Sequence, residues 1–388
     1  MTKTQIAITE LKNSEEAGRE LGRTIRIGFA GAAADAVFVF ASAQHDYTAL
    51  LRGLCDEAGT DVVAGSSSAG EFTNVSRGEG QVSALGIRSQ DMRFALGLGQ
   101  DVSTDPLRAA SQVAASFQQA VGPALPHRSA MVMTDALAGH TDALVEELTV
   151  LTGGEYKFFG GGAGDDGAFR KTHVFAGRVA HTNAVVALEI QSIKPLGIGV
   201  AHGWEPVGAG LRVTESREAV LVSLNGVPAL DAFEQHAEKT GQKFDRADAL
   251  PFFLHNVIGI RMQDGFRLRV PLAVQEDGSI LCAAAIPEGS VVHFMRTSAE
   301  SAVQAAKQAT RAAISALGGN RPAGAFVFDC VATRLRMGAA FEDELQACSN
   351  LLEPAGFVGC NTYGQIARAE GQFSGFHNCT AVVCALPE

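Results

Sequence analysis

The chain has 388 residues, enough for two or three domains, and 46% of them are hydrophobic, so it can bury sizeable cores. Its formal net charge of −11 argues against non-specific nucleic-acid binding, which needs clustered Lys and Arg. Residues 1–22 are polar and lack the apolar segment of a secretory signal, and the apolar stretch 25–40 is too short to span a bilayer.

Cysteine usage points to a reducing compartment. Seven cysteines are scattered along the chain, an odd number without a C-x-x-C pair. This pattern argues against a disulfide framework and against a thiolate zinc site. We therefore expect mostly buried thiols in a cytoplasmic protein.

Strand and helix signals alternate through the first half of the chain. Short apolar runs predict buried strands, and apolar residues at helical spacing predict helices. The expected strands are 36–41, 61–64, 81–87, 92–98, 129–134 and 156–159, and the expected helices are 46–58, 106–121 and 141–151.

After Gly167 the pattern becomes strand-rich. Further strands are expected at 172–175, 183–190, 197–202, 266–270 and 280–285, and helices at 231–239 and 303–317, the latter after a segment at 297–300 that resembles a capping box. We place the main boundary near Asn225, which gives an N-terminal extension (1–29), a first domain (30–224) and a second domain (225–388). The predicted fold is two mixed-sheet α/β domains.

The most informative feature is an internal repeat of strand, helix, strand and glycine turn. One copy ends in Ala64-Gly-Ser-Ser-Ser-Ala-Gly-Glu-Phe72, and another ends in Val358-Gly-Cys-Asn-Thr-Tyr-Gly-Gln-Ile366. The two glycines of each turn share a register, and Glu71 corresponds to Gln365. A weaker third copy ends in Gly160-Gly-Gly-Ala-Gly-Asp165. We interpret this pattern as duplication of one α/β unit.

These turns predict a ligand site. Glycine turns lined by small polar residues expose backbone N–H groups that can hold an anion or a polar ligand, and duplicated strand ends often line a shared cleft. The alternative is that the glycines only make tight turns, which the serines fill. Asp165 and its neighbour Asp166 could bind an amine or form a solvated turn. The candidate ligand-binding residues are Gly65, Ser66, Ser67, Ser68, Gly70, Glu71, Gly161, Gly162, Asp165, Asn361, Thr362, Gly364 and Gln365.

Two histidines lie in apolar surroundings, His202 in Gly-Val-Ala-His-Gly-Trp204 and His377 in Gly-Phe-His-Asn-Cys379. Either could be a core residue with satisfied hydrogen bonds. The other interpretation is an axial ligand to a non-covalently bound haem, which needs an imidazole inside an apolar pocket. Trp204, the only tryptophan, fits a ligand pocket and core packing equally well.

Signatures of catalysis and of nucleotide binding are missing from the sequence. The third turn lacks the Lys-Ser/Thr ending of a P-loop, its spacing is not that of a dinucleotide-binding fingerprint, and the sequence has neither an H-E-x-x-H motif nor a G-x-S-x-G elbow. Cys330 ends a buried-looking strand, which favours an inert thiol. We therefore expect a binding protein and not an enzyme.

Several of these segments together resemble the FIST family. Segments 63–71, 160–166 and 197–208 are similar to its N-terminal domain, and segments 224–230, 271–279 and 361–366 to its C-terminal domain. Gln365 stands where the family more usually has Glu, so the resemblance carries no fixed charge to that position.

The resemblance implies a sensory module of bacterial signalling that binds small ligands. Stand-alone members of this length include nitric-oxide-sensing haemoproteins that act on a histidine kinase, as in two-component systems, or on cyclic-di-GMP enzymes. The first hypothesis is therefore a sensor that holds haem b through His202 or His377 and reports nitric oxide to such a partner. The second is a sensor of a polar metabolite such as an amino acid, without haem. The third is an enzyme that uses the same cleft.

Overall fold

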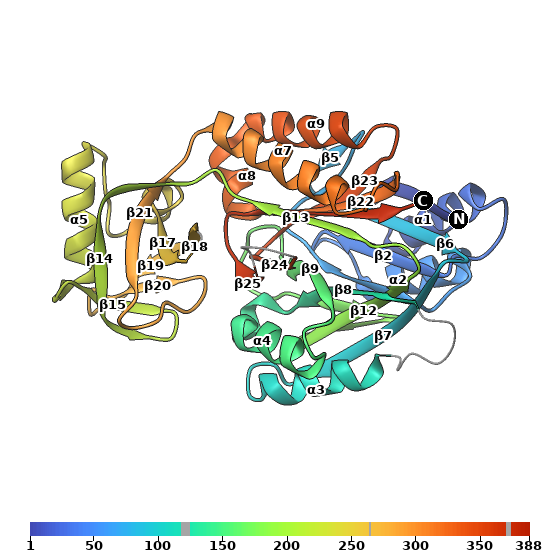
Figure 1. The fold of residues 1–388 in the computed structure, drawn as a ribbon, viewed down its shortest axis with the longest axis horizontal. Coiled ribbons are helices and arrows are strands. Elements are labelled where there is room, and N and C mark those ends of the chain that lie inside the picture. Colours follow the sequence, from blue (N-terminus) through green and yellow to red (C-terminus); the bar gives the residue numbers. More distant parts are fainter. Residues whose placement is uncertain (118–124, 264, 370–373) are drawn as a thin grey trace.

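Three parallel strand–helix–strand units form the framework of the main body (Figure 1). The computed structural model describes residues 1–117, 125–263, 265–369 and 374–388. The first unit is β2 (Ala36–Ala41), α2 (Tyr47–Ala58) and β3 (Val63–Ser67); the second is β8 (His127–Thr134), α4 (Thr141–Leu151) and β9 (Lys157–Gly162); the third is β22 (Pro322–Cys330), α9 (Phe341–Leu352) and β23 (Phe357–Thr362). The mixed α/β class and the predicted repeat are both confirmed.

Each unit belongs to its own six-stranded sheet, and the three sheets have the same strand order. Two antiparallel strands extend each parallel pair on one side. They are β6 (Val82–Ser89) and β1 (Thr2–Thr9) in the first sheet, β12 (Ala184–Ser192) and β7 (Met92–Gln100) in the second, and β26 (Ala381–Pro387) and β13 (Gly197–Ala201) in the third. The body is therefore a threefold repeat of one sheet.

On its other side, each sheet ends in a hairpin that comes from a neighbouring unit. The three hairpins are β4 (Glu71–Thr73) with β5 (Arg77–Gly78), β10 (Val174–Ala176) with β11 (Val179–His181), and β24 (Gln365–Arg368) with β25 (Ser374–His377). The hairpin that follows the first unit pairs with the third sheet, through β4 and β23. The hairpin that follows the third unit pairs with the second sheet, through β24 and β9, and the hairpin that follows the second unit pairs with the first sheet, through β10 and β3. The exchange is therefore cyclic.

The three sheets face one another across a common apolar core. Phe38 and Phe40 of β2 meet Phe326 and Phe328 of β22, and Phe159 of β9 joins them. Helix pairs cover the outer faces: α1 (Ser14–Gly28) with α2, α3 (Pro106–Ser116) with α4, and α7 (Ala299–Ser315) with α9. Because burial of apolar surface dominates folding stability, this shared core makes the three units one body.

The N-terminal region holds the first strand and helix of this arrangement. Asn13 caps α1 by accepting the N–H of Glu16, and Ala17, Leu21 and Ile25 bury one face of the helix against α2. The predicted helix 106–121 is observed as α3, which ends at Ser116, and residues 118–121 lie outside the described residues. The predicted capping box is wrong by one residue, because Ser298 and Ser301 make it.

A smaller lobe is inserted between β13 and α7 and stands beside the body (Figure 1). It has its own core, which includes Phe233, Phe253 and Phe294. Its elements are β14 (Glu205–Arg217), β15 (Val220–Leu224), β16 (Val227–Pro228), α5 (Ala229–Thr240), α6 (Leu250–Phe253), β17 (Val257–Met262), β18 (Gly265–Arg269), β19 (Pro271–Val274), β20 (Ile280–Cys282) and β21 (Val291–Arg296). The expected boundary near Asn225 lies between β15 and β16.

Candidate functional site

The first glycine of each turn is fixed by the parallel strand beside it. Gly65, Gly160 and Gly359 pair with Val39, Val132 and Val327 in the same register. A Cβ at any of the three would come within 3.0 Å of the carbonyl oxygen of its valine partner. Only glycine fits there, and the predicted register of Gly65 with Gly359 is observed.

The three turns meet and are joined by a ring of equivalent backbone hydrogen bonds. The N–H of Ala69 donates to the carbonyl of Asn361 (2.9 Å), that of Tyr363 to Gly162 (2.9 Å), and that of Gly164 to Ser67 (3.0 Å). Donors and acceptors hold the same places in the repeat. The predicted gathering of the turns therefore exists, but these backbone groups bond one another.

Most of the predicted polar side chains of the turns are buried and bond one another. The hydroxyl of Ser68 bonds Glu71, and the Nε2 of Gln365 donates to the hydroxyl of Thr362 (2.8 Å). Glu71 accepts the N–H of Gln81, just as Gln365 accepts that of Thr380, both at 3.2 Å. Burial raises the pKa of Glu71 to about 8. Glu71 and Gln365 thus make equivalent hydrogen bonds in their two turns. A protonated Glu71 can donate and accept hydrogen bonds as glutamine does.

The second unit departs from the repeat at its turn. In strand register, Val174 takes the place of Glu71 and Gln365, so residues 165–172 are an insertion. The carboxylate of Asp165 accepts the N–H groups of Phe169, Arg170 and Lys171 at 2.6–2.8 Å, and the hydroxyl of Tyr363 also bonds it. Burial alone would raise the pKa of Asp165, but these bonds outweigh it and lower the pKa. The carboxylate of Asp165 therefore fixes the conformation of the inserted loop to which it belongs.

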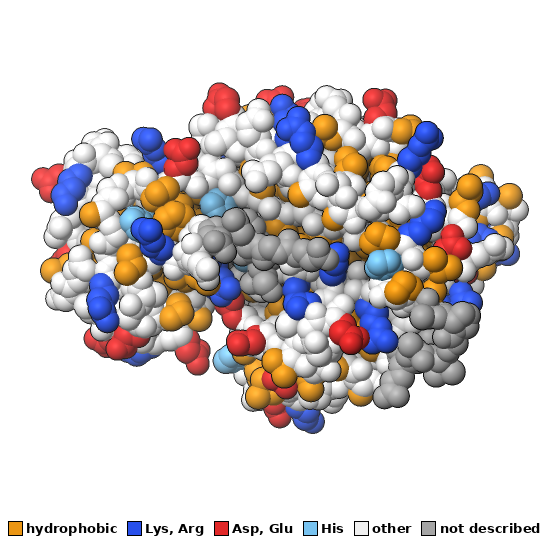
Figure 2. Space-filling model, in the orientation of Figure 1, with side chains coloured by type: hydrophobic (Ala, Val, Ile, Leu, Met, Phe, Trp, Pro, Cys, Tyr) orange, Lys and Arg blue, Asp and Glu red, His pale blue; other side chains and the backbone are white. Residues whose placement is uncertain are grey.

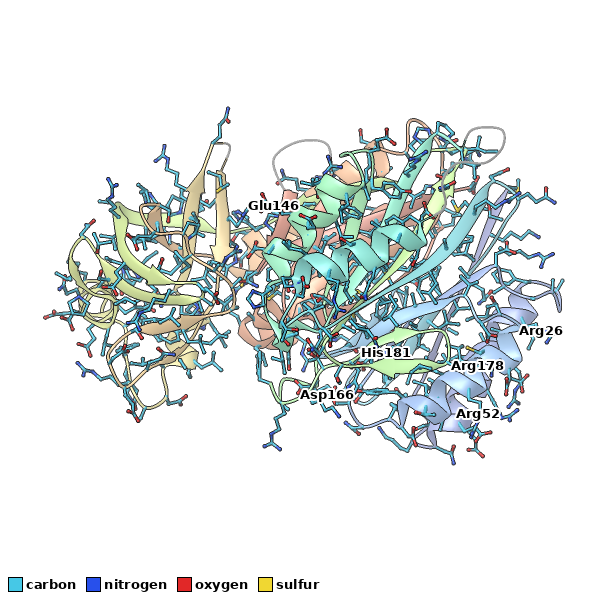
Figure 3. The ribbon with its side chains drawn as sticks, turned by 90° about the horizontal axis from the view of Figure 1, so that it is seen from below. Arg26, Arg52, Glu146, Asp166, Arg178 and His181 are labelled. Carbon is cyan, nitrogen blue, oxygen red and sulfur yellow. The ribbon has the colours of Figure 1, made fainter. Side chains whose placement is uncertain are left out.

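Asp166 and the hairpin after it also make internal contacts. Asp166 accepts the hydroxyl of Ser42 (2.7 Å) and the N–H of Ala43 (3.0 Å), which ties the insertion to the end of β2. In Figure 3, Asp166 lies to the left of the hairpin that carries Arg178 and His181. Arg178 bonds Asp56 (2.6 Å) and Asp61 (2.7 Å).

An open pocket lies where the hairpin of the first unit packs against the helices of the third. Its volume is about 390 Å³, within the range of small-molecule sites. We call it the arginine pocket; it is lined by Glu71, Phe72, Arg77, Gly78, Glu79, Arg334, Leu335, Gly338, Ala339, Phe341 and Asn361. Two of the predicted ligand residues, Glu71 and Asn361, line it, and the exchange of hairpins brings them together from opposite ends of the chain.

Two arginines line this pocket, and each is paired with a glutamate. Arg334, on α8 (Val331–Met337), donates to the carbonyl of Ala69 (2.5 Å) and pairs with Glu79. Gly70, at φ +131°, leaves the space for it, since a Cβ there would collide with the Nη1 of Arg334. Arg77 pairs with Glu342 at 3.2 Å and is partly exposed. Guanidinium groups of this kind bind carboxylates through paired hydrogen bonds.

Asn361 lines the same pocket and has an unused donor that is buried behind the pocket surface. The residue is only 1% exposed, and its Nδ2 has no hydrogen-bond partner among the described residues. Buried polar groups almost always have a partner, so an orphan donor in a pocket wall indicates a missing acceptor. The sequence singled out Asn361 but not Arg77 or Arg334. Arg334 lies in the connection between β22 and α9. A comparison of this connection with the equivalent ones in the other two repeats could have identified it.

The other two units have equivalent positions with different contents. Between the β2–α2 connection and hairpin β10–β11 lies a pocket of about 560 Å³, lined in part by His45, Tyr47, Asp165 and His173. Between α4 and hairpin β24–β25, Arg269 of the lobe bonds Asp142 and the carbonyl of Phe376. One of the three positions is thus occupied by the protein itself.

The two candidate haem ligands lie where the lobe joins the body. The Nε2 of His202 bonds the carbonyl of Phe266 (3.1 Å), and its Nδ1 accepts the N–H of Trp204 (3.2 Å). Burial, with Arg267, Arg269 and His202 nearby, lowers the pKa of His377 to about 3, so this imidazole is neutral. Trp204 is buried in an apolar cluster, and Arg336 lies 5.5 Å from its ring centroid.

Haem does not fit these residues as they stand. Both ring nitrogens of His202 are used by the backbone, so neither offers iron a lone pair. Asn378, the residue after His377, lines an apolar cavity of about 50 Å³, whereas ligands of this size need sites of roughly 300 Å³ or more. In the view of Figure 2 the surface is hollowed where lobe and body meet.

Comparisons with known proteins cover most of the chain. Residues 35–227 match the model of the FIST N domain, and residues 229–368 match that of the FIST C domain. The uncharacterized protein MJ1623 of Methanocaldococcus jannaschii is 28% identical over 173 residues, which is 42% of this chain and 32% of that protein. The chain therefore matches about a third of that relative's length.

Solved structures resemble the chain only remotely. Cyanuric acid hydrolase from A. caulinodans gives a TM-score of 0.33 at 8% identity, with 99% of both chains covered. Phosphoribosylformylglycinamidine synthase II from Thermotoga maritima gives 0.23 at 12% identity, with 99% of this chain and 72% of that one covered. Scores this low carry no argument.

None of the helices within the described residues is both long and apolar enough to cross a bilayer.

Proposed function

The chain belongs to the FIST family, whose domains are sensory domains that bind small ligands, and from this premise we propose that it senses a small polar metabolite bearing a carboxylate, such as an amino acid. The arginine pocket is the proposed site. The observation that carries the proposal is the orphan amide of Asn361 beside Arg334 in a pocket of about 390 Å³.

The pocket supplies complementary groups for such a ligand. Arg334 and Arg77 would pair with its carboxylate, and the Nδ2 of Asn361 would donate to the same group. Phe72, Leu335 and Phe341 give the walls an apolar part for an aliphatic side chain. A mostly apolar pocket with a few placed polar groups is typical of sites for small molecules. We propose binding without turnover.

The signal would pass to a partner protein. A histidine kinase or a cyclic-di-GMP enzyme is the proposed receiver, as the family resemblance implies. We further propose that the protein works in the cytoplasm, which its seven free, buried cysteines support. Haem and nitric oxide are not part of this proposal, because His202 and His377 do not fit haem as they stand.

Calorimetry and thermal-shift measurements with a panel of amino acids and simple carboxylates test the proposal. At least one compound should raise the melting temperature and bind with one-to-one stoichiometry. Arg334→Lys keeps the charge but loses the planar fork, and should weaken binding by at least tenfold. Arg77→Gln should weaken it less, since Arg77 is more exposed.

Arg246→Gln is the matched control, because Arg246 pairs with Glu234 in the lobe, away from the pocket. It should leave affinity unchanged. Binding that is equally strong in the Arg334 and Arg77 variants would rule out this pocket, and a failure of every compound to bind would rule out the proposed function.

A further inference from the structure

Two buried thiols meet where the third sheet packs against the lobe. Strand β22 ends at Cys330, and Cys379 lies just ahead of β26. Phe328 pairs with Val382 in the antiparallel ladder of these strands, so the same register, continued past its last pair, sets Cys330 opposite Thr380 and next to Cys379. The two cysteines share one apolar cluster, and their thiols hydrogen-bond each other. They are therefore neighbours in space.

The contact between the two thiols makes them chemically unlike. Hydrogen bonds from the thiol and the backbone N–H of Cys379, and from the N–H of Ala332, lower the pKa of Cys330, although burial opposes them. The same thiol contact, with burial, raises the pKa of Cys379. Burial also raises the pKa of the remaining cysteines, which are Cys55, Cys282, Cys348, Cys360 and Cys384. Because the thiolate is the reactive form, Cys330 is the thiol of this chain best suited to act as a nucleophile.

A small cavity gives molecules from the solvent a way to Cys330. Its volume is about 50 Å³, and its lining includes Cys330 together with Phe169 and Leu335, which are 41% and 48% exposed. One water molecule needs about 10–15 Å³ of such space, so a molecule as small as hydrogen peroxide fits. Cys330 is the one cysteine among the described residues that line the cavity. A reagent that enters therefore meets Cys330 before Cys379.

We propose that Cys330 and Cys379 are a site of reversible oxidation by hydrogen peroxide, at which Cys330 attacks the oxidant and Cys379 then closes a disulfide. This site is separate from the arginine pocket and does not depend on its ligand. At Cys330 the sequence favours an inert thiol, because it gives no sign that Cys379 lies beside it.

Two steps complete the oxidation. The thiolate of Cys330 attacks one oxygen of the peroxide, the O–O bond breaks, and the other oxygen leaves as hydroxide, which takes a proton from solvent to become water. Cys330 is then a sulfenic acid. The sulfur of Cys379 attacks the sulfur of this sulfenic acid, the S–O bond breaks, and the hydroxide leaves as water with the proton of Cys379. One peroxide is thus reduced to two waters while two thiols become one disulfide, which a thiol reductant reverses.

Hydrogen peroxide added to the reduced full-length protein at neutral pH tests the inference by mass spectrometry. The wild type should lose two hydrogens in intact mass, its proteolytic fragments should show Cys330 joined to Cys379, and dithiothreitol should restore the original mass. Cys379→Ser should stop at the sulfenic acid, which dimedone labels on Cys330. Cys330→Ser should form no disulfide and leave Cys379 unlabelled. Cys55→Ser is the matched control, because Cys55 is equally buried in the first unit, and it should react as the wild type does.

Mapping of the folded wild type needs no variant, so a serine substitution that prevents folding does not shield the inference from refutation. A wild type that shows no bond between Cys330 and Cys379 after treatment, whether its mass stays unchanged or only gains oxygen, would overturn it. Dimedone labelling of Cys379 and not of Cys330 in the single variants would overturn the assigned roles. The same oxidation in concentrated urea should give mixed pairings among the seven cysteines, and an equal mixture from the folded protein would show that the fold does not select this pair.

Discussion

Arg269 and Asp142 join the lobe to the main body through a two-pronged ion pair. The Nη2 of Arg269 lies 3.1 and 3.0 Å from the two carboxylate oxygens of Asp142. The arginine side chain is 2% exposed and that of Asp142 is 30% exposed. Arg269 also donates to the carbonyls of Ala285 (2.9 Å) and Phe376 (3.2 Å). One side chain therefore links the lobe, the second unit and the hairpin of the third unit.

Removing the carboxylate should cost more stability than removing the arginine. Asp142→Ala leaves a buried guanidinium without its counter-charge, a change that costs about 3–5 kcal/mol. Arg269→Met removes the buried charge and leaves Asp142 partly in water, so its cost should be smaller. Chemical denaturation of both variants measures the difference.

The surface pair of Arg246 and Glu234 provides the control for that experiment. Arg246→Ala should change the free energy of unfolding by less than about 1 kcal/mol. If Asp142→Ala lowers the free energy of unfolding no more than Arg246→Ala does, the ion pair between Arg269 and Asp142 does not stabilise the attachment of the lobe.

Glu71→Gln should remove a pH dependence of stability without harming the fold. The folded protein keeps a proton on Glu71 up to about pH 8, whereas the unfolded chain loses it above about pH 4.5. The contribution of Glu71 is therefore complete below pH 4.5 and is lost as the pH rises to about 8. Its loss is on the order of 5 kcal/mol. Glutamine needs no proton, and Gln365 already serves in the equivalent place.

Urea denaturation between pH 5 and pH 9 measures this effect for the wild type and the variant. The difference in unfolding free energy should grow in favour of the variant as the pH rises and should level off above pH 8. Parallel curves would show that Glu71 is already ionised in the folded protein.

Gly65→Ala should destabilise the protein because the added methyl group meets the carbonyl of Val39 on the neighbouring strand. Overpacking of this kind costs about 1–3 kcal/mol, and a backbone partner cannot easily yield, so the upper end is expected. Gly97→Ala on β7 is the comparison, since the nearest atom to its added carbon is 3.1 Å away. Thermal denaturation of both should show the larger loss at Gly65, and equal losses would contradict the account of the turn.

Purified protein mixed with haem should show only the absorption spectrum of free haem. His377→Ala should give the same spectrum as the wild type, since both ring nitrogens of His202 are already bonded and the cavity next to His377 is too small for haem. A sharpened Soret band that disappears in His377→Ala would show that the junction between lobe and body opens to admit haem.

Local signals in the sequence predict the units well but not their exchange. Buried runs such as 36–41 and the glycine turn at Gly65 depend on neighbouring residues, so periodicity and turn chemistry reveal them. The pairing of Phe72 with Gly359 depends on contacts between distant segments, which no local pattern encodes. Helix α1 is not among the predicted elements, although Asn13 and the spacing of Leu21 and Ile25 signal it.

The candidate site shows the same division. Glu71 and Asn361 belong to turns that the sequence marks, and both line the arginine pocket. Ser66, Ser67 and Thr362 follow the same pattern, yet none of them lines this pocket. Composition indicates that a turn is polar, but packing decides which of its side chains are open to a ligand. Arg334 reaches the pocket from a helix whose role depends on the exchanged hairpin.

The cyclic exchange of hairpins also has a consequence for biosynthesis. Strand β4 leaves the ribosome early but finds its partner β23 only when nearly all of the chain has been made. Until then its backbone groups offer an unpaired edge to other chains, and the long separation in sequence slows correct closure. Nascent or truncated chains should therefore depend on chaperones far more than the finished molecule does.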